Sequence, residues 1–487
     1  MPSQQAPAPL PPVPLIKLST DTFTNTTSQH ATEVEPGAFA FGSTIVTAFQ
    51  VGRIFGGGGA DIGFATSTDG GATWKNGFLP GITLFQGGGA FTAVSDPAVA
   101  YDATNARWLI ASLPLGRTQA PQNIVAVSSS QDGITWSSNI VQVSHTADAD
   151  KNWITCDNSS KSPNVGNCYV EWDDPGNSDL IWMSKSSDGG QTWQNPGRNT
   201  LDKATGLGGI PVVQPNNGNV IVPIEQVCNA CAPSMLAYSS TDGGNTWSAT
   251  VKISPITDHL VAGDLRTEPL PSANIDAAGT VYVVWQDCRF RANCTSNDLV
   301  LSTSSDGTTW TPPARIPIDA ITSTVDHFIP GLGIDPATSG STAHLGLTYY
   351  FYPVANCGAS PLPACQLEAG FIASQDGGTT WSAPTTLTIP MSLSSLPNTF
   401  AGLMVGDYIS TVFAGGKARP IFALANPPST GNVFDEAIYT TTNAFAGAEA
   451  RRFSSAGERS VPGAHSDHGP RKFYDLERRH RVVLPPK

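Results

Sequence analysis

The sequence predicts an all-β protein, a β-propeller of seven four-stranded antiparallel blades, and two observations carry this prediction. The chain of 487 residues contains 48 glycines and 39 prolines, while charged residues make up only 13%. Such a composition is typical of a β protein that is rich in turns. One short segment also occurs six times, at intervals of 54 to 70 residues, and each interval has room for one four-stranded sheet.

The repeated segment reads Ser-x-Asp-Gly-Gly-x-Thr-Trp, with one residue fewer in two copies. An Asp followed by Gly can fold its carboxylate back onto backbone N–H groups while the Gly takes a positive φ, which makes a tight turn. The Trp then begins the outgoing strand and fills space between adjacent sheets. We expect these residues to build hairpin turns and not to react. The six aspartates are Asp69, Asp132, Asp188, Asp242, Asp306 and Asp376.

Seven segments, one more than the repeats, have the sequence of a blade's first, innermost strand. Residues 15–18 form a lone strand suited to complete the last sheet and close the ring. We therefore expect the propeller over residues 14–445, with six blades as the alternative count. Residues 1–13 are predicted to be a Pro-rich lead-in, and residues 446–487 a basic, disordered tail. The seven starts are Glu35-Pro36, Asp96-Pro97, Asp150 to Trp153, Ile210-Pro211, Glu268-Pro269, Ile329-Pro330 and Asp407-Tyr408.

The charge of the chain is unevenly distributed and excludes some classes of partner. The net charge is −13; residues 451–487 carry nine Lys/Arg and four Asp/Glu, a local +5, so residues 1–450 carry −18. A region this acidic repels the phosphate backbone of DNA or RNA, which argues against nucleic acid as a partner. No stretch approaches the roughly 18 apolar residues of a membrane helix, so no membrane span is expected. We expect a monomer.

The eight cysteines form four couples that are close in sequence, with none left over. Such couples in a chain poor in lysine indicate local disulfides and therefore a secreted, extracellular protein. Metal binding is the alternative for the pair at 228 and 231, although no second ligand pair stands nearby. The first residues show no basic start followed by an apolar run, so no signal peptide is visible. The couples are Cys156/Cys168, Cys228/Cys231, Cys288/Cys294 and Cys357/Cys365.

These repeats, at this spacing, resemble the Asp-box (BNR) repeats of the sialidase superfamily, over about nine tenths of the chain. The resemblance implies the propeller fold with Asp-box turns, and says less about activity because one fold hosts many functions. Sialidases carry Arg-Ile-Pro at the first inner strand, where this chain has Glu35-Pro36, so one substrate-clamping Arg is missing. Asp61 fits the acid/base Asp, and Arg53 lies where that loop often has a basic residue. Tyr408 or Tyr349 could stand for the nucleophile, but neither has a matching context.

Strand direction predicts where a site would lie. The first strands all begin on one face, here called the entry face, and a propeller brings these starts together around its axis. A pair of carboxylates there could cleave a glycoside, and oxygen ligands there could hold Ca²⁺; otherwise no cofactor is expected. The third possibility is that these acids only cap strand ends. The candidate ligand-binding residues are Glu35, Arg53, Asp96, Arg266, Asp326, His327 and Asp407.

Three functions remain open from the sequence. The favoured one is a secreted sialidase-like propeller that binds a glycan or another small extracellular ligand at its axis. Whether it is an enzyme stays open; a glycoside hydrolase would use Asp61 with Glu268, with Tyr408 as a further candidate. A true exo-α-sialidase is less favoured, because bidentate Arg groups usually hold an anionic sugar and most of that clamp is absent. The last alternative is a non-catalytic scaffold that presents stiffened loops to protein partners.

Overall fold

The computed structural model describes residues 12–117, 121–146, 148–227, 231–354, 365–429, 431–446 and 453–454. Across these ranges the chain forms β-strands and four short 3-10 turns, η1 (Pro175–Asn177), η2 (Ala292–Cys294), η3 (Gly340–Thr342) and η6 (Leu393–Ser395), with no α-helix. A search of the same ranges finds no helix of the length and apolarity that crossing a bilayer requires.

Most strands pair with their sequence neighbours in antiparallel groups. The first group holds β2 (Ser28–Phe41), β3 (Thr44–Ile54), β4 (Gly59–Ser67) and β5 (Lys75–Phe78). The second holds β6 (Ala93–Asp102), β7 (Arg107–Leu115), β8 (Ala126–Ser130) and β9 (Val141–Gln142). The third holds β10 (Asp150–Cys156), β11 (Cys168–Asp174) and β12 (Leu180–Ser186).

The pattern continues along the chain. The fourth group holds β13 (Gly206–Leu207), β14 (Val212–Val213), β15 (Val220–Gln226), β16 (Ser234–Ser240) and β17 (Val251–Pro255). The fifth holds β18 (Ser272–Ile275), β19 (Val281–Asp287), β20 (Asp298–Ser304) and β21 (Ala314–Arg315). The sixth holds β22 (His327–Ile334), β23 (Leu345–Phe351), β24 (Gln366–Ser374), β26 (Thr385–Thr386) and β27 (Met391–Ser392).

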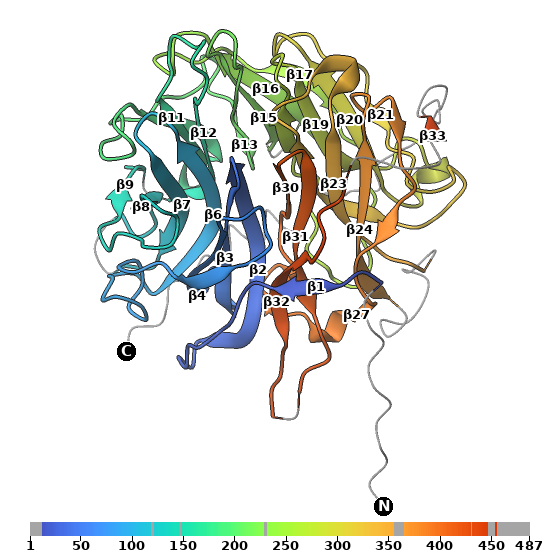
Figure 1. Cartoon of the computed structure of the whole chain (residues 1–487), viewed down its shortest axis with the longest axis horizontal. Helices are drawn as coiled ribbons and strands as arrows, with labels where there is room; N and C mark the ends of the chain where they lie inside the picture. The colour runs from blue at the N-terminus through green and yellow to red at the C-terminus, as the bar shows by residue number, and fades with distance from the viewer. Residues whose placement is uncertain are drawn as a thin grey trace, which may run out of the picture.

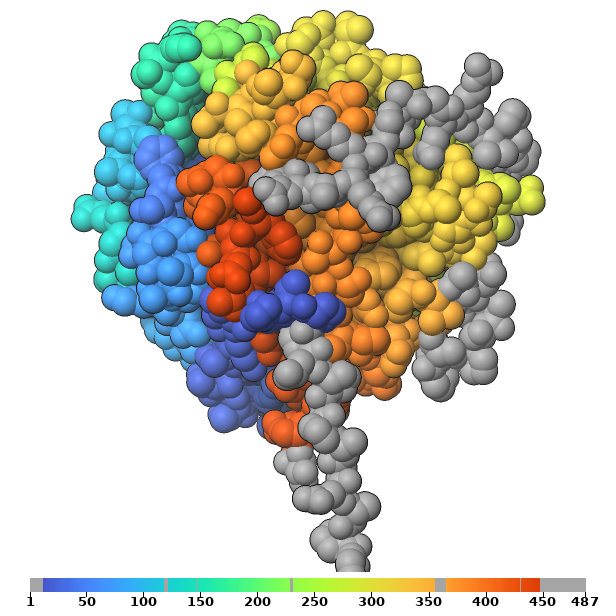
Figure 2. Space-filling model, turned by 45° about the vertical axis from the view of Figure 1, so that its right-hand side comes forward, coloured from blue at the N-terminus to red at the C-terminus, as the bar shows by residue number. Residues whose placement is uncertain are grey.

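The last group brings the two ends of the fold together. It holds β30 (Ser410–Ala414), β31 (Lys417–Ala425) and β32 (Glu436–Thr441), and β1 (Leu15–Lys17) pairs antiparallel with β32. The pairing predicted for the lone first strand is therefore present, and Figure 2 shows β1 lying across the strands that end the fold. Two small pairs complete the set: β25 (Thr380–Trp381) with β33 (Phe453–Ser454), and β28 (Asn398–Thr399) with β29 (Gly402–Leu403).

The groups follow one another around the molecule in chain order (Figure 1). Their first strands lie side by side around a closed path: β2 contacts β6, and β10, β14, β18, β22 and β30 follow, until β30 contacts β2. Single residue pairs also join β32 to β2 and β4 to β6, so these groups share one twelve-stranded sheet. Apolar side chains fill the spaces between neighbouring groups and form the core.

The repeated turns have the self-capped geometry that the sequence predicts. At Asp69, Oδ1 accepts the backbone N–H groups of Ala72 (3.0 Å) and Thr73 (2.9 Å), and Oδ2 accepts the Thr73 hydroxyl (2.6 Å). The indole N–H of Trp74 donates to the Gly71 carbonyl (3.1 Å). The same three bonds to the carboxylate recur at Asp188 and Asp242, so these carboxylates are used in turns.

Candidate functional site

Four first strands carry the same irregularity near their starts. In each, one residue other than glycine has a positive φ, and the pairing register shifts there: Glu35 (58°), Asp96 (48°), Lys151 (45°) and Ile329 (49°). A bulge of this kind bends its strand and redirects a side chain. A left-handed conformation costs about 1–3 kcal/mol for such residues, so the surrounding structure must impose it. Three of the four redirected side chains are ionisable.

One of the redirected side chains, Lys151, meets Arg266 at the carboxylate of Asp407, which precedes β30. The Arg266 Nε donates to Asp407 Oδ1 (2.7 Å), and an Arg266 Nη and the Lys151 ammonium both donate to Oδ2. The small β28–β29 hairpin positions Arg266, whose backbone N–H donates to the Leu403 carbonyl (2.8 Å). The three side chains are at least nine-tenths buried, so a network of buried charges lies on the axis.

A second chain of contacts connects Glu35 to Asp96. The Gln50 amide donates to Glu35 Oε2 and to the Ser95 hydroxyl (3.0 Å), which in turn donates to Asp96 Oδ1 (2.8 Å). The other Asp96 oxygen accepts the backbone N–H of Lys151 (3.1 Å), and Glu35 Oε1 accepts that of Asp407 (3.2 Å). Side chains from the first, second, third and last groups are thereby held in one cluster.

Burial and neighbouring charge push the two central carboxyls in opposite directions. Burial, and after it the Asp407 carboxylate, raises the pKa of Glu35 from 4.5 to about 8. Burial alone would raise the pKa of Asp407 as well, but Arg266 and Lys151 outweigh it and hold that pKa well below its usual range. At neutral pH, Glu35 is therefore protonated and Asp407 ionised.

Arg53 is a buried cation in the same cluster whose partners are uncharged. Its Nη1 donates to the Gly58 carbonyl (2.7 Å) and to Gln50 Oε1 (3.1 Å), and its Nε lies 3.1 Å from the Met404 sulfur. The side chain is only 2% exposed, and among the described residues no carboxylate forms an ion pair with it. Burial lowers the pKa of Arg53, and the nearby Arg266 lowers it further.

The cluster forms the floor of a pocket of about 660 Å³ on the entry face. Glu35, Arg53, Asp96, Lys151 and Arg266 all line it. Three phenylalanines, Phe55, Phe85 and Phe400, and two further acids, Asp148 and Asp150, line the rest, and Phe55 is 53% exposed. The pocket thus combines aromatic walls with a charged floor.

The proposed catalytic residues lie outside this pocket. The turn after β3 is short, so Asp61 lies within β4, opposite Val51 and fully buried, and it does not line the pocket. Glu268 is half-buried and does not line it either. The structure therefore does not bring Asp61 and Glu268 together in the entry-face pocket. Tyr408 lines a different cavity; its hydroxyl donates to the Pro97 carbonyl (3.1 Å), and burial raises its pKa well above the usual value.

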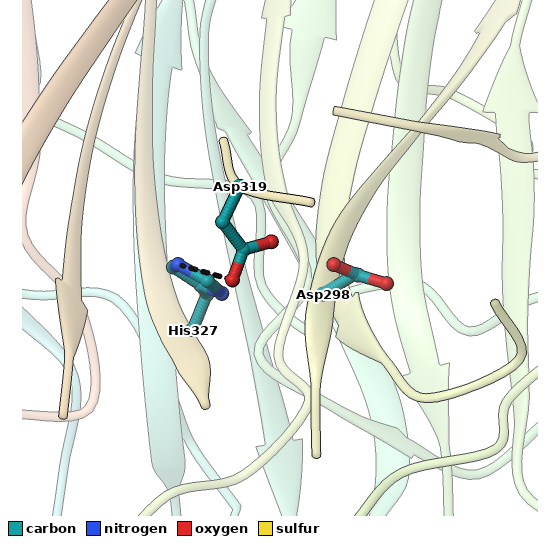
Figure 3. Close-up of side chains that lie close together, drawn as sticks. All are labelled: Asp298, Asp319 and His327. Carbon is teal, nitrogen blue, oxygen red and sulfur yellow. Dashed lines mark ion pairs between the residues drawn. The ribbon is translucent and has the colours of Figure 1, made fainter. Parts of the chain in front are cut away.

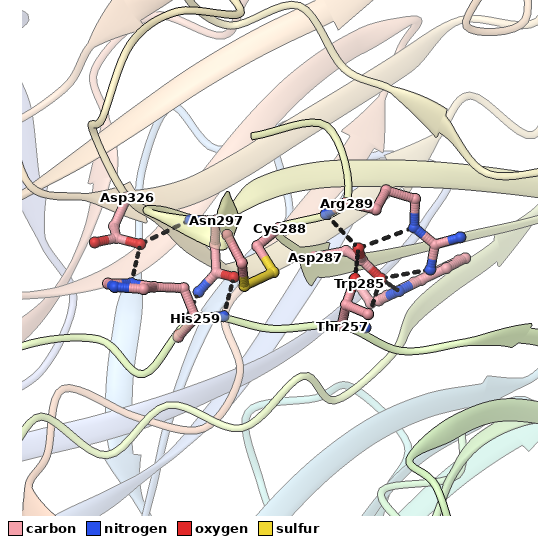
Figure 4. Close-up of a disulfide and its surroundings, with 9 residues drawn as sticks. Thr257, His259, Trp285, Asp287, Cys288, Arg289, Asn297 and Asp326 are labelled. Carbon is pink, nitrogen blue, oxygen red and sulfur yellow. Dashed lines mark hydrogen bonds and ion pairs between the residues drawn. A yellow bond between two sulfur atoms is a disulfide. The ribbon is translucent and has the colours of Figure 1, made fainter. Parts of the chain in front are cut away.

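Asp326 and His327 also lie apart from the axial cluster. Asp326 Oδ1 accepts the backbone N–H of Asn297 (2.7 Å) and lies 3.1 Å from His259 Nδ1 (Figure 4). His327 Nε2 lies 4.0 Å from Asp319 Oδ2, in a group with Asp298 (Figure 3), and burial lowers its pKa to about 4.

The group of Asp298, Asp319 and His327 has the spacing of a metal site, but its charge does not suit a cation. Arg291 forms ion pairs with both carboxylates (2.5 and 2.6 Å), and so does Arg315 (2.9 and 2.6 Å). A Ca²⁺ would have to displace two buried guanidinium groups. The structure therefore gives this cluster a role in linking strands and loops, not in holding a metal.

Two predicted disulfides are present, Cys156–Cys168 and Cys288–Cys294 (Figure 4). Cys231 and Cys365 are disulfide-bonded as well, while Cys228 and Cys357, their predicted partners, lie outside the described residues. Beside Cys288, the Asp287 carboxylate is bound by the Arg289 guanidinium (2.6 and 2.9 Å). These bonds are consistent with an extracellular location.

Comparison with solved structures shows the fold. An ulvan lyase of polysaccharide lyase family PL25, bound to GlcA(1-4)Rha3S, has a TM-score of 0.50 at 11% identity, covering 87% of this chain and 95% of that chain. This chain has the sialidase-like β-propeller fold. The Hadza microbial sialidase Hz136 matches at 15% identity and a TM-score of 0.43, over 86% of this chain but just under two thirds (66%) of that one. A leech intramolecular trans-sialidase matches at 11% identity and a TM-score of 0.40, over 88% of this chain and 70% of that one. No family model and no curated protein matches the chain.

In this propeller, five of the candidate residues lie in one cluster: Glu35, Arg53, Asp96, Arg266 and Asp407. The sequence did not single out Lys151 as a ligand-binding candidate, and it gave no role to Gln50. The position of Lys151 at a first-strand start was a usable signal, because Glu35 and Asp96 occupy the same place in their strands. Nothing in the sequence around Gln50, in the middle of β3, indicates that its side chain reaches the axis.

Proposed function

We propose that the propeller has seven blades and that the repeated turns are Asp-boxes. The closed path of contacts through β2, β6, β10, β14, β18, β22 and β30 supports seven, since each of these strands begins one group. The hydrogen bonds around Asp69, Asp188 and Asp242 support the turn assignment.

On this framework we propose that the entry-face pocket binds a glycan that carries an acidic group. The observation that carries the proposal is the Arg53 guanidinium, which is buried in the pocket floor with only uncharged partners. Within the part of the chain that the structure describes, no carboxylate contacts this buried guanidinium directly, and a carboxylate or sulfate from a ligand would supply that charge-assisted contact. The phenylalanines of the wall offer faces on which sugar rings can pack. The ulvan lyase of similar fold is bound to a saccharide that contains a uronic acid.

Glycoside hydrolysis is the second candidate, favoured by the protonated state of Glu35. A carboxylic acid with a pKa of about 8 can donate a proton to a leaving glycosidic oxygen at neutral pH. Asp96, linked to Glu35 through Gln50 and Ser95, would be the second carboxyl. True sialidase action is less well supported, because Arg266 is already bound to Asp407 through two nitrogens. A scaffold without ligand or activity is the remaining alternative.

The test compares binding of neutral, uronic-acid and sulfated oligosaccharides by calorimetry. We expect saturable binding of an acidic glycan, and we expect Arg53→Gln to weaken it about tenfold or more, since loss of a charge-assisted contact costs at least ~1.4 kcal/mol. Arg198→Gln is the matched control, because Arg198 contacts carbonyls outside the pocket. Equal binding of neutral and acidic glycans, or full affinity in Arg53→Gln, would contradict the proposal. Absence of saturable glycan binding would favour the scaffold.

Hydrolysis is tested separately with Glu35→Gln. If the protein is a glycoside hydrolase, the unchanged protein cleaves the glycan and releases product. The Glu35→Gln variant should bind the glycan with the same affinity and release no product. If the unchanged protein binds an acidic glycan but never cleaves it, hydrolysis is rejected and binding stands.

A further inference from the structure

A second cavity, of about 700 Å³, lies at the opposite end of the axis from the entry-face pocket. The far ends of the first strands line it, from Phe41 at the end of β2 to Asp335 just after β22, together with the turns that follow them. Asp407 lines this cavity, while its partners Lys151 and Arg266 line the other pocket. The ionic network therefore stands between the two cavities.

Five aromatic side chains stand in the cavity wall, among mostly aliphatic and small residues. Trp153 and Tyr408 pack edge to face, with ring centroids 5.2 Å apart, and both line the cavity. Phe39 and Phe413 are half-buried there, and Phe41 is 42% exposed at the mouth. Aromatic faces carry negative electrostatic potential and attract cations.

The charged side chains of the lining are all acidic. They are Asp157, Asp335 and Asp407, and no Lys, Arg or His is among the described residues that line the cavity. The entry-face pocket differs, because Arg53, Lys151 and Arg266 line it. Lys151 and Arg266 pair with Asp407 from the other side, so the remaining acids of the lining are Asp157 and Asp335, which lie at the mouth, where their strands end, and are 2% and 5% exposed.

Both mouth carboxylates are held in place by turns. Asp157 Oδ1 accepts the Ser159 backbone N–H (3.1 Å), and Oδ2 accepts the Ser162 hydroxyl. Asp335 Oδ1 accepts the Ala337 backbone N–H (3.1 Å), and its Oδ2 lies 3.8 Å from Nδ1 of the partly exposed His344. They come from the third and sixth groups, so they flank the mouth from different sides.

We propose that this cavity binds a small organic cation, an alkyl- or arylammonium compound. Its apolar body lies against Trp153 and the neighbouring aromatic rings, and its ammonium group lies toward Asp157 and Asp335 at the mouth. An organic cation suits this cavity for two reasons. The apolar walls disfavour a strongly hydrated metal ion, and the acidic lining repels anions. This site is independent of the glycan pocket.

Three probes of matched shape and different charge test the proposal: 4-phenylbutylammonium, 4-phenylbutanol and 4-phenylbutyrate. Calorimetry at low salt and pH 8 should show saturable binding of the ammonium, about tenfold weaker binding of the alcohol, and none of the carboxylate. Equal affinity for the ammonium and the alcohol would overturn the proposal, and so would absence of saturable binding of the ammonium.

Variants locate the binding. The double change Asp157→Asn and Asp335→Asn should remove the preference for ammonium and leave the affinity for the alcohol, since each Asn keeps an oxygen that can accept from the turn. Thr155→Phe fills the cavity and should abolish binding of both probes. Asp202→Asn is the control, because the exposed Asp202 carboxylate accepts from Thr250 and lines neither cavity; it should leave the binding of all three probes unchanged. If Thr155→Phe or the double variant binds the ammonium as the unchanged protein does, the cavity is not the site.

Melting curves check that each variant is folded. Should the double variant not fold, the single Asp335→Asn variant and the salt dependence of the unchanged protein replace it. The ammonium affinity must then fall in Asp335→Asn and with added salt, whereas the alcohol affinity must not; any other result overturns the proposal.

Discussion

Two buried glutamates lie where the end of the fold meets its beginning. Glu33 and Glu436 are each 1% exposed, and the single pair that joins β2 to β32 is Thr32 with Glu436. Glu33 Oε2 accepts the Ser19 hydroxyl (2.7 Å), and the Ser19 oxygen accepts the Ile438 backbone N–H (2.8 Å). Burial raises the pKa of Glu33 from 4.5 to about 8, and burial together with Glu33 raises that of Glu436 well above its usual value. The closure of the ring therefore contains protonated carboxyls.

This arrangement predicts that stability falls as pH rises. Between pH 4.5 and about 8 the folded state keeps the Glu33 proton, which the unfolded chain has lost, so the folded state is favoured at the lower pH. The difference of 3.5 units, at about 1.4 kcal/mol each, gives an upper limit of about 5 kcal/mol for this residue. Glu33→Gln stays neutral at every pH and retains an acceptor for Ser19. It should match the unchanged protein below pH 4.5 and exceed it by a few kcal/mol at pH 8.

The assay is urea unfolding of both proteins from pH 4 to 9, read as the difference in free energy of unfolding at each pH. Taking the difference removes the pH dependence of buried acids that do not interact with Glu33; the pKa of Glu436 depends on Glu33, so its share remains in the difference. Asp435→Asn is the local control, because Asp435 is about one third exposed and only 3.5 Å from the exposed Lys17 ammonium; it should show no such gain. A difference between Glu33→Gln and the unchanged protein that stays flat with pH, or that turns against the variant at pH 8, would refute the reasoning.

Three further changes test other parts of the structure by urea unfolding. Asp407→Ala leaves two buried cations without their carboxylate and should cost about 3–5 kcal/mol; a loss below 1 kcal/mol would mean that the network does not hold the axis together. Asp242→Ala removes the acceptor of a repeated turn and should cost about 1–2 kcal/mol, with Asp242→Asn costing less. Replacing Cys288 and Cys294 by Ser opens a short loop and should cost about 2 kcal/mol; no loss would show that the loop is held without its disulfide.

The sequence predicted those parts of the structure that repeat. The turn at Asp69 and the convergence of Glu35, Asp96 and Asp407 follow from the spacing of similar segments, because a position that recurs in each unit returns to the same place around the axis. Asp61 was misplaced because the glycines after β3 make a shorter turn than a binding loop needs, so the residue falls inside β4. Its burial could not be deduced from the local sequence.

The sixth group shows the limit of reasoning from similar starts. Asp326 and His327 were expected at the axis because they open the sixth inner strand. In the first two groups, however, the redirected residue is the one directly before proline, Glu35 or Asp96, and the matching residue in the sixth group is Ile329. Asp326 instead binds the backbone of Asn297, on a loop of the preceding group. Counting from the proline, and not from the first polar residue, gives the correct position.

Ile329 also decides how the strained backbone should be interpreted. It takes the same positive φ as Glu35, Asp96 and Lys151, yet its side chain is 1% exposed in the hydrophobic core. The bulge is thus a structural device that lets a first strand turn toward the axis, and its strain is not by itself evidence of a binding site. What distinguishes the entry-face pocket is that three of the four bulges carry ionisable side chains, and that the buried Arg53 guanidinium has only uncharged hydrogen-bond partners. Arg53, and not the strained residues around it, is therefore the feature that calls for a ligand.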